Sequence, residues 1–290
     1  MLKLNFRHIF KLMRPKQWTK NLFVFGAMIF SGKFVDENIF IKNIFIFIMF
    51  CLISSCVYIL NDLVDAEKDR QHPEKKNRPI ASGKVTKFQA RIVEIILLFV
   101  IFTVCYEMNI KLFIVLLIYF LINVLYSFKL KNIVIIDVMI ITFGFVLRVQ
   151  SGGIATNVQL SPWMILCTIL ISLFIALNKR KSEIIVLKSK RGEHRKILDE
   201  YSVELIDNML TIVTPSVFIA YCLYTFSSIQ SRTMMFTIPF VLYGIFRYQY
   251  LTMKENIGGK PEDIFQKDFP FLINIVLWII TVIIIIYFKL

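Results

Sequence analysis

Residues 61–83 read NDLVDAEKDRQHPEKKNRPIASG, and this polar stretch directly follows an uncharged apolar run at 44–60 that is long enough to cross a membrane. Asp62, Asp65 and Asp69 are spaced by three and four residues, so a helix that continues past residue 60 presents them on one face. Three carboxylates at a helix C-terminus oppose the helix dipole and repel one another, which favours a bound cation. Hydrated Mg²⁺ suits spaced carboxylates that also meet a phosphate. The pattern predicts a site for a metal and a diphosphate at the membrane surface; a solvated helix end with ordinary acids is the alternative.

The composition is that of an integral membrane protein. The 290 residues are 57% hydrophobic, include 28 Phe and have a mean hydropathy of +0.67, which is too apolar for a water-soluble domain. We expect an all-α fold of about nine transmembrane helices in a single domain, 1–290. Uncharged runs of spanning length lie at 44–60, 112–128, 156–178, 208–231 and 271–288, and shorter apolar runs lie near 18–32, 89–107, 133–155 and 233–251.

Basic residues fall mainly on one side of the predicted bundle. If the first span starts in the cytosol, 28 of the 34 Lys and Arg lie on that side, at 1–20, 63–91, 129–131, 179–196 and 247–267. This asymmetry predicts an N-terminus inside and a C-terminus outside the cell inner (plasma) membrane. It also accounts for the net charge of +14, and no aromatic-rich basic module is apparent, so we expect no nucleic-acid partner.

The N-terminal segment 1–20 is predicted to be a cytosolic amphipathic helix that lies on anionic lipid. Lys3, Arg7, Lys11 and Arg14 share one helical face, away from the aromatic and aliphatic side chains. A plain positively charged flank of the first span is an equally good interpretation.

Further polar side chains surround the three aspartates in the first cytosolic loop. Asn61 supplies an amide beside Asp62, and we group it with the aspartates as a candidate catalytic residue. Lys75 and Arg78 follow, and cations beside a metal and diphosphate site can bind further phosphate oxygens. Prolines restrict the loop around Arg78. Topology alone also places cations here, so the role of each stays open.

A second polar loop, at 179–204, is expected at the same mouth of the bundle. Lys179 and Arg180 are predicted to contact phosphate, and Glu183 is predicted to bind metal or a sugar hydroxyl. Lys179 and Glu183 are four residues apart, so they can instead pair with each other on a helix surface.

Polar residues near the ends of other spans complete the candidates. Asp137 lies about one turn into the fifth span, where an ionisable group is costly and therefore a candidate for function. Tyr126 and Lys129, at the end of the fourth span, can reach the same mouth. Arg148 lies about 17 Å farther along the fifth span at 1.5 Å per residue. It faces the bundle interior or extends to the far interface.

The motif NDxxDxxxD at 61–69, followed by RPIASG at 78–83, resembles the first motif of the UbiA superfamily of intramembrane prenyltransferases. The resemblance implies about nine transmembrane helices around a central cavity with cytosolic cap loops. The mouth of such a cavity holds Mg²⁺ and a diphosphate, which implies that Asp62, Asp65 and Asp69 are metal ligands.

Within this superfamily the chain is similar to the decaprenyl-phosphate phosphoribosyltransferases, which make polyprenyl-phosphoryl phosphoribose for the cell envelope. The similarity runs from residue 14 to about residue 250. It adds Lys20 to the expected phosphate-binding residues, which also include Tyr126 and Lys129 from the end of the fourth span. The matching segments are RPxQWxKN at 14–21, DRxHPxK at 69–75, YSxxLK at 126–131, GFxLR at 144–148, KRxxE at 179–183 and PFxLYxxFRY at 239–248.

One departure separates the branches of the superfamily. Prenyltransferases that act on aromatic acceptors usually carry a second Asp-rich motif after the sixth span, whereas this chain reads NKRKSE at 178–183. A donor with an additional phosphate explains these cations. Phosphoribosyl pyrophosphate carries such a phosphate on its ribose, and a prenyl diphosphate does not.

The resemblance implies a Mg²⁺-dependent transfer of 5-phosphoribose from phosphoribosyl pyrophosphate to a polyprenyl phosphate, with release of pyrophosphate. An aromatic-acceptor prenyltransferase of the same fold, which uses a polyprenyl diphosphate, is the alternative. A membrane transporter is a different class, but it more often carries ionisable groups near the membrane midplane. The expected partners are the two substrates and the membrane, and a homo-oligomer is compatible with the sequence.

Overall fold

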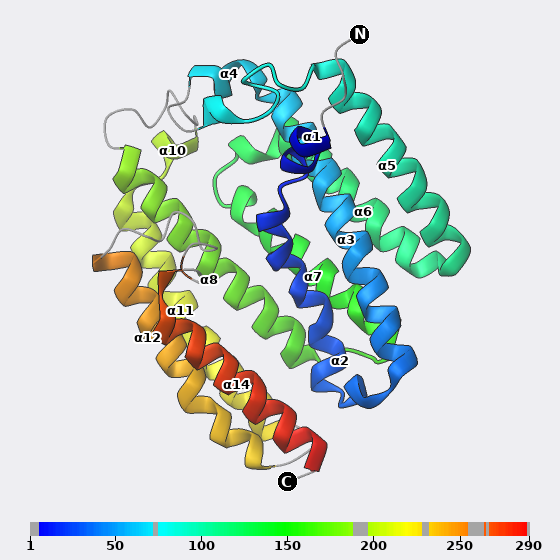
Figure 1. Ribbon diagram of the computed structural model, residues 1–290. Helices are drawn as coiled ribbons and strands as arrows, with labels where there is room; N and C mark the ends of the chain where they lie inside the picture. Colours follow the sequence, from blue (N-terminus) through cyan, green and yellow to red (C-terminus); the bar gives the residue numbers. More distant parts are fainter. Residues whose placement is uncertain are drawn as a thin grey trace.

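The computed structural model describes residues 6–71, 75–187, 197–227, 232–254, 264 and 267–288 (Figure 1). Every regular element in these ranges is helical, as expected for an all-α membrane protein. Lys3, His72 and the basic residues at 188–196 lie outside the described ranges.

Long helices form the body of the molecule, because a backbone in lipid must satisfy its hydrogen bonds within its own segment. These helices are α3 (Glu37–Val64), α5 (Lys87–Met108), α6 (Ile110–Phe128), α7 (Ile136–Thr156), α8 (Pro162–Leu187), α11 (Val203–Ser227), α12 (Ile238–Lys254) and α14 (Phe269–Phe288). The short α-helices are α1 (Phe6–Leu12), α2 (Gly26–Phe30), α4 (Ala66–Gln71) and α10 (Ile197–Glu200). Short 3-10 segments are η1 (Pro15–Phe25), η2 (Lys33–Val35), η3 (Lys75–Asn77), η4 (Leu130–Asn132) and η6 (Arg232–Thr237).

Seven helices in the described part of the chain are long and apolar enough to cross a membrane, namely all of the long helices except α12. Helix α12 has 17 residues, and Arg247 lies within it. The span expected near 18–32 is divided between the 3-10 segment η1 and the five-residue helix α2. Length and hydropathy therefore give seven spans, and the expected total of nine stays a prediction.

Capping residues set the boundary between α7 and α8. The hydropathy pattern places the start of a span at Thr156, but α7 ends there and Asn157 adopts a left-handed conformation with φ 53°. Helix α8 starts at Pro162, and the Oγ of Ser161 accepts a hydrogen bond from the amide of Met164 (3.1 Å). Serine is a favoured N-cap and proline suits the first helical position, so these residues override the apolar pattern.

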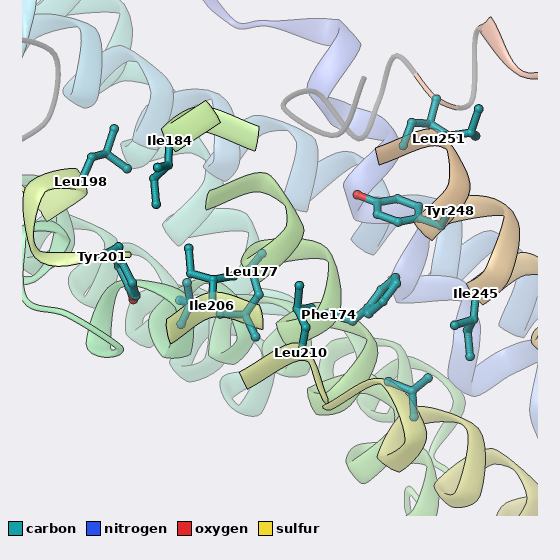
Figure 2. Close-up of a cluster of buried hydrophobic side chains, with 14 of the residues drawn as sticks. Phe174, Leu177, Ile184, Leu198, Tyr201, Ile206, Leu210, Ile245, Tyr248 and Leu251 are labelled. Atoms are coloured by element: carbon teal, nitrogen blue, oxygen red, sulfur yellow. The ribbon is translucent and has the colours of Figure 1, made fainter. Parts of the chain in front are cut away.

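Helix α7 lies between two apolar cores. On one side it joins α3, α5 and α6 around a buried cluster that includes Phe50 and Leu147. On the other side its first turns contact a second cluster, formed mainly by α8, α10, α11 and α12, in which Phe174 and Tyr248 pack together (Figure 2). Because α7 contributes to both clusters, its two ends position different parts of the bundle.

Gly152 allows η1 to touch α7 directly. A Cβ atom at this position would lie 1.9 Å from the carbonyl oxygen of Val24, so no other residue fits without moving a backbone. The contact holds η1 against α7.

Arg148 faces the bundle interior, as one of the two sequence interpretations proposed. The side chain is 5% exposed, and its Nε, Nη1 and Nη2 atoms donate to Asn21 Oδ1 (2.8 Å), Gly144 O (2.7 Å) and Tyr119 OH (2.8 Å). Its guanidinium also lies 4.9 Å from the ring centre of Tyr119. Neutral oxygen acceptors and an aromatic face therefore solvate this buried cation.

The start of α14 provides a test of stability. Asp268 pairs with Arg247 through two hydrogen bonds (2.6 and 3.1 Å) and accepts a third from the amide of Phe271 (2.8 Å). We expect Asp268→Ala to lower the free energy of unfolding by about 2 kcal/mol, because a cap and a charge-assisted pair are both lost. The Arg247 hydrogen bonds hold the pKa of the Asp268 carboxyl below its ordinary value of 3.8. The stabilisation is therefore full at neutral pH and is lost as the pH falls through the lowered pKa.

Thermal unfolding in detergent, followed from pH 7 down to pH 3, measures this contribution. Asp36→Ala is the matched control, because Asp36 caps α3 through the amides of Asn38 (2.9 Å) and Ile39 (3.2 Å). An equal loss of stability in both variants would contradict the contribution assigned to the Arg247 pair.

Candidate active site

The acidic motif is divided between two helices. Helix α3 ends at Val64, Asp65 forms a bend and α4 starts at Ala66. Asp62 is therefore on α3 and Asp69 is on α4, so the single helical face expected from the spacing is interrupted at Asp65.

Buried apolar side chains hold the loop that follows α4. Ile80 and Val85 lie in a cluster with Leu12 of α1, and all three are less than 5% exposed. The amide of Gly83 donates to the carbonyl of Ile80 (3.1 Å), and Gly83 adopts φ 74°, a left-handed conformation that glycine reaches without a steric penalty. This packing fixes the part of the loop from which Arg78 extends.

Two arginines hold the buried carboxylates of the first motif. Nη1 of Arg78 donates to Asp62 Oδ1 (3.1 Å) and to Asp69 Oδ2 (2.6 Å), and Nη2 of Arg14 also donates to Asp62 Oδ1. Asp62 is 2% exposed and Asp69 is 3% exposed, whereas both arginines are partly exposed. A cavity of about 300 Å³ lies beside them, lined by Lys11, Arg14, Asp62, Lys75, Asn77, Arg78 and Pro79. We refer to these residues with Asp69 as the Asp62 cluster.

Arg14 is a site residue that the sequence patterns do not reveal. It lies between α1 and η1 with φ 54°, and its guanidinium is 5.0 Å from the ring centre of Tyr58. The only indication of its role in the sequence is its position in the matching segment at 14–21. Its partner Asp62 is 48 residues away in sequence, and no local spacing predicts that contact.

Asp65 and Asn61 contact the end of α6 and the residues that follow it. Nζ of Lys131 donates to both carboxylate oxygens of Asp65 (2.8 and 3.0 Å). Oγ of Ser127 donates to Asn61 Oδ1 (2.7 Å). These contacts tie the first acidic motif to α6.

The carboxylates of the Asp62 cluster fit a Mg²⁺ ion that takes few protein ligands. Within the described ranges, no group of three or more His, Cys, Asp or Glu is arranged to enclose a metal. Oδ2 of Asp62 is buried and has no hydrogen-bond partner, so it is left for a cation. Mg²⁺ commonly takes one or two carboxylates and completes its shell with water and substrate phosphate. Asp62 and Asp69 match that requirement, and Asp65 as a ligand stays a prediction.

A second polar cluster lies where α6, α7 and α8 meet. Arg180 is 1% exposed, and its Nε, Nη1 and Nη2 atoms donate to Asp137 Oδ2 (2.7 Å), Glu183 Oε2 (2.5 Å) and Tyr126 OH (3.5 Å). The hydroxyl of Tyr201 donates to the other oxygen of Asp137 (2.8 Å). We refer to these five residues as the Arg180 cluster. Because protein groups surround its guanidinium, Arg180 is placed to organise neighbouring side chains.

Tyr201 is the second residue that sequence reasoning misses. It follows α10, and 64 residues separate it from Asp137. A tyrosine in an acidic loop carries no spacing signal, so the contact becomes visible only in three dimensions.

The end of α6 joins the two clusters. Tyr126 bonds to Arg180, and its neighbour Ser127 bonds to Asn61. In Figure 1, α1, α4 and α10 lie at the same end of the bundle, which places both clusters at one mouth.

Three predicted phosphate-binding lysines lie outside the cavity lining given above. Nζ of Lys20 donates to Gln17 Oε1 (2.6 Å) on η1. Lys129 is exposed and its backbone caps the end of α6, and Lys179 is half-buried beside Arg180 on α8. Their roles in phosphate binding stay predictions, whereas Lys75 and Arg78 do line the cavity.

A structural role for Arg180 predicts a large loss of stability on its removal. We expect Arg180→Ala to lower the free energy of unfolding by about 3–5 kcal/mol, because it leaves the buried Asp137 without a counter-charge. Lys181→Ala is the control on the same helix, since Lys181 pairs with the partly exposed Asp207 (2.5 Å) and should cost less than about 1 kcal/mol. Thermal or denaturant unfolding in detergent measures both. Equal stability of the two variants would show that Arg180 is not part of the scaffold.

Comparison with known proteins gives a consistent result across the chain. Residues 22–276 match the UbiA prenyltransferase family. The chain is 32% identical to decaprenyl-phosphate phosphoribosyltransferase from Mycolicibacterium smegmatis, over 97% of this chain and 93% of that protein. It is 29% identical to proteins of the same name from Corynebacterium glutamicum (96% of this chain, 86% of that protein) and Mycobacterium tuberculosis (94% and 92%).

Solved structures share the fold. A UbiA homolog from Archaeoglobus fulgidus bound to DMAPP and Mg²⁺ superposes with a TM-score of 0.72 at 18% identity, covering 96% of this chain and 99% of that one. A structure from work on digeranylgeranylglyceryl phosphate synthase gives 0.69 at 20% identity, covering 96% and 97%. At these identities the similarity establishes the architecture, which is the expected one.

Proposed function

The chain belongs to the UbiA prenyltransferase family, and from this membership we propose that it transfers 5-phosphoribose from phosphoribosyl pyrophosphate to a polyprenyl phosphate. The curated relatives that it matches over almost their whole length carry the name of this activity. Pyrophosphate is the second product.

The charge of the Asp62 cluster is the observation that carries this proposal. Four cationic side chains, Lys11, Arg14, Lys75 and Arg78, line one cavity together with the buried carboxylate of Asp62. A diphosphate bound through a divalent ion does not need four cations. A donor with a further phosphate on its sugar uses them more fully, because each phosphate oxygen gains a charge-assisted donor.

Asp62 and Asp69 would hold Mg²⁺ against the donor diphosphate. The ion, when bound, stabilises the negative charge that develops on the departing pyrophosphate. Arg78, which contacts both carboxylates, and Arg14, which contacts Asp62, would orient the phosphate oxygens. During transfer the bond from C1 of the ribose to pyrophosphate breaks and a bond from C1 to an acceptor phosphate oxygen forms. The acceptor phosphate is anionic at neutral pH, so the step needs no dedicated base.

The Arg180 cluster has a different part in this proposal. Asp137 and Arg180 hold Glu183 and Tyr126 at the mouth, and these two side chains would face the ribose or a substrate phosphate. The charge asymmetry of the loops supports a plasma-membrane location with both clusters on the cytosolic side. The polyprenyl tail would then lie along the apolar outer faces of the spanning helices.

A donor exchange assay tests the proposal. Purified protein in detergent with Mg²⁺, labelled phosphoribosyl pyrophosphate and a polyprenyl phosphate is expected to give a labelled lipid and free pyrophosphate. The same protein with a polyprenyl diphosphate and an aromatic acceptor is expected to give no product. If product forms only with the polyprenyl diphosphate and the aromatic acceptor, the proposal is wrong and the protein is a prenyltransferase for aromatic acceptors.

The substitution Asp62→Asn tests whether the Asp62 carboxylate is required for turnover. We expect turnover to fall by at least ~100-fold, because the variant loses the charge that holds the ion while keeping the shape of the side chain. Asp36→Asn is the matched control at the far end of α3, where asparagine also caps a helix well. A normal rate for Asp62→Asn would remove Asp62 from the mechanism.

A further inference from the structure

The connector between α6 and α7 contains a strained turn. Ile135 has φ 70° and ψ −45°, and the amide of Ile136 bonds to the carbonyl of Val134 (2.8 Å), which closes a three-residue turn. Classic γ-turns of this kind are rare, and a β-branched side chain at positive φ makes the conformation costly. Such strain persists only where surrounding contacts impose it.

The hydroxyl of Tyr201 supplies one such contact. It accepts a hydrogen bond from the amide of Ile135 (2.8 Å) and donates one to Asp137 Oδ1 (2.8 Å). The ring is 2% exposed and packs at one end of the buried cluster in Figure 2, so the hydroxyl has a fixed position. Burial raises the pKa of the Tyr201 phenol, which keeps the proton available for Asp137.

The other end of the connector is also held. Lys131, four residues before Ile135, pairs with Asp65 of the first acidic motif. Asp137, two residues after Ile135, pairs with Arg180. The turn at Ile135 therefore sits between a contact to the first motif and a contact to the Arg180 cluster, and its shape sets their spacing.

We propose that Tyr201 is a positioning residue for the transfer reaction: its hydroxyl holds the strained turn at Ile135 and so keeps the Arg180 cluster in register with the acidic motif on α3 and α4. Tyr201 acts through Ile135 and Asp137 and touches no substrate. The inference rests on the proposed phosphoribosyl transfer. Catalytic groups misplaced by about 1 Å can lose much of their effect, which is why one hydroxyl at this point matters.

Removal of the hydroxyl tests the role. We expect Tyr201→Phe to lower kcat roughly 10-fold, since the Ile135 amide and Asp137 each lose a hydrogen-bond partner. The Asp62 cluster keeps its own contacts, so the KM for phosphoribosyl pyrophosphate should change less than roughly 3-fold if the loss is confined to positioning.

Rescue at Ile135 distinguishes positioning from packing. Glycine adopts positive φ without a steric penalty, so Ile135→Gly should keep the turn when the tyrosine hydroxyl is absent. We expect Ile135→Gly alone to retain near-normal kcat. The double variant with Tyr201→Phe should recover part of the lost rate, because glycine restores the turn but not the hydrogen bond to Asp137. No recovery in the double variant would overturn the proposal, because Tyr201 would then act in another way.

Tyr221→Phe is the matched control. Tyr221 is also buried, and its hydroxyl also makes two hydrogen bonds: one shared with the hydroxyl of Thr237 (2.7 Å) and one accepted from Trp278 Nε1 (2.8 Å). The variant should lose stability by an amount similar to Tyr201→Phe and keep normal kcat. If Tyr221→Phe and Tyr201→Phe lose kcat to a similar extent, general destabilisation explains the loss and the proposal is contradicted.

Hydrogen exchange provides a readout that does not depend on activity. The amides of residues 133–139 should exchange faster in Tyr201→Phe and return toward wild-type rates in the double variant. Unchanged exchange would also overturn the proposal. If wild-type protein fails to use phosphoribosyl pyrophosphate while the exchange pattern holds, the reaction assignment is wrong and the turn assignment stands.

Discussion

The buried carboxylates of Asp62, Asp69 and Asp137 can remain in this apolar bundle because a guanidinium lies against each of them. Asp62 meets Arg14 and Arg78, Asp69 meets Arg78, and Asp137 meets Arg180. Removal of one partner from a buried ion pair destabilises a protein by about 3–5 kcal/mol, because an uncompensated charge is left away from water. The ion pairs must therefore form together with the fold. Because each buried carboxylate needs an arginine beside it, the charged side chains collect at one mouth of the bundle. The candidate site consists of these side chains.

The arginines of the two clusters differ in how accessible their guanidinium groups are. Arg180 is enclosed by Asp137, Glu183 and Tyr126, and its guanidinium donates its hydrogen bonds to these protein groups. Arg14 and Arg78 are partly exposed and border a cavity, so they can exchange a protein oxygen for a substrate oxygen. The first arrangement suits a scaffold and the second suits binding. Within the basic segment at 178–183, these contacts favour a scaffold role for Arg180.

Hydropathy predicted the helical architecture, and the resemblance of the motifs predicted the family. The polar residues chosen from the loops and span ends include most of the side chains that meet at the mouth. Hydropathy and motif spacing could not predict the break at Asp65, because a bend between two helices leaves the period of the acids unchanged. They also missed Arg14 and Tyr201, whose partners are far away in sequence. The boundary at Thr156 was misplaced because capping by Ser161 and Pro162 has no hydropathy signal. Long-range pairing and capping, rather than apolar content, account for the differences.

The attachment of Arg14 has a consequence for how water and lipid meet in this protein. Arg14 lies two residues after the end of α1. Helix α1 buries Leu12 against the polar loop and exposes Phe6 and Phe10. Lys11 of α1 lines the same cavity as Arg14, so the helix that borders the cavity is also the one whose aromatic rings can insert among lipid headgroups. A change in the bilayer surface, such as altered curvature or charge, would reach Arg14 through a single short helix. The bilayer that dissolves the polyprenyl substrate would therefore also contact the helix beside the proposed phosphate site.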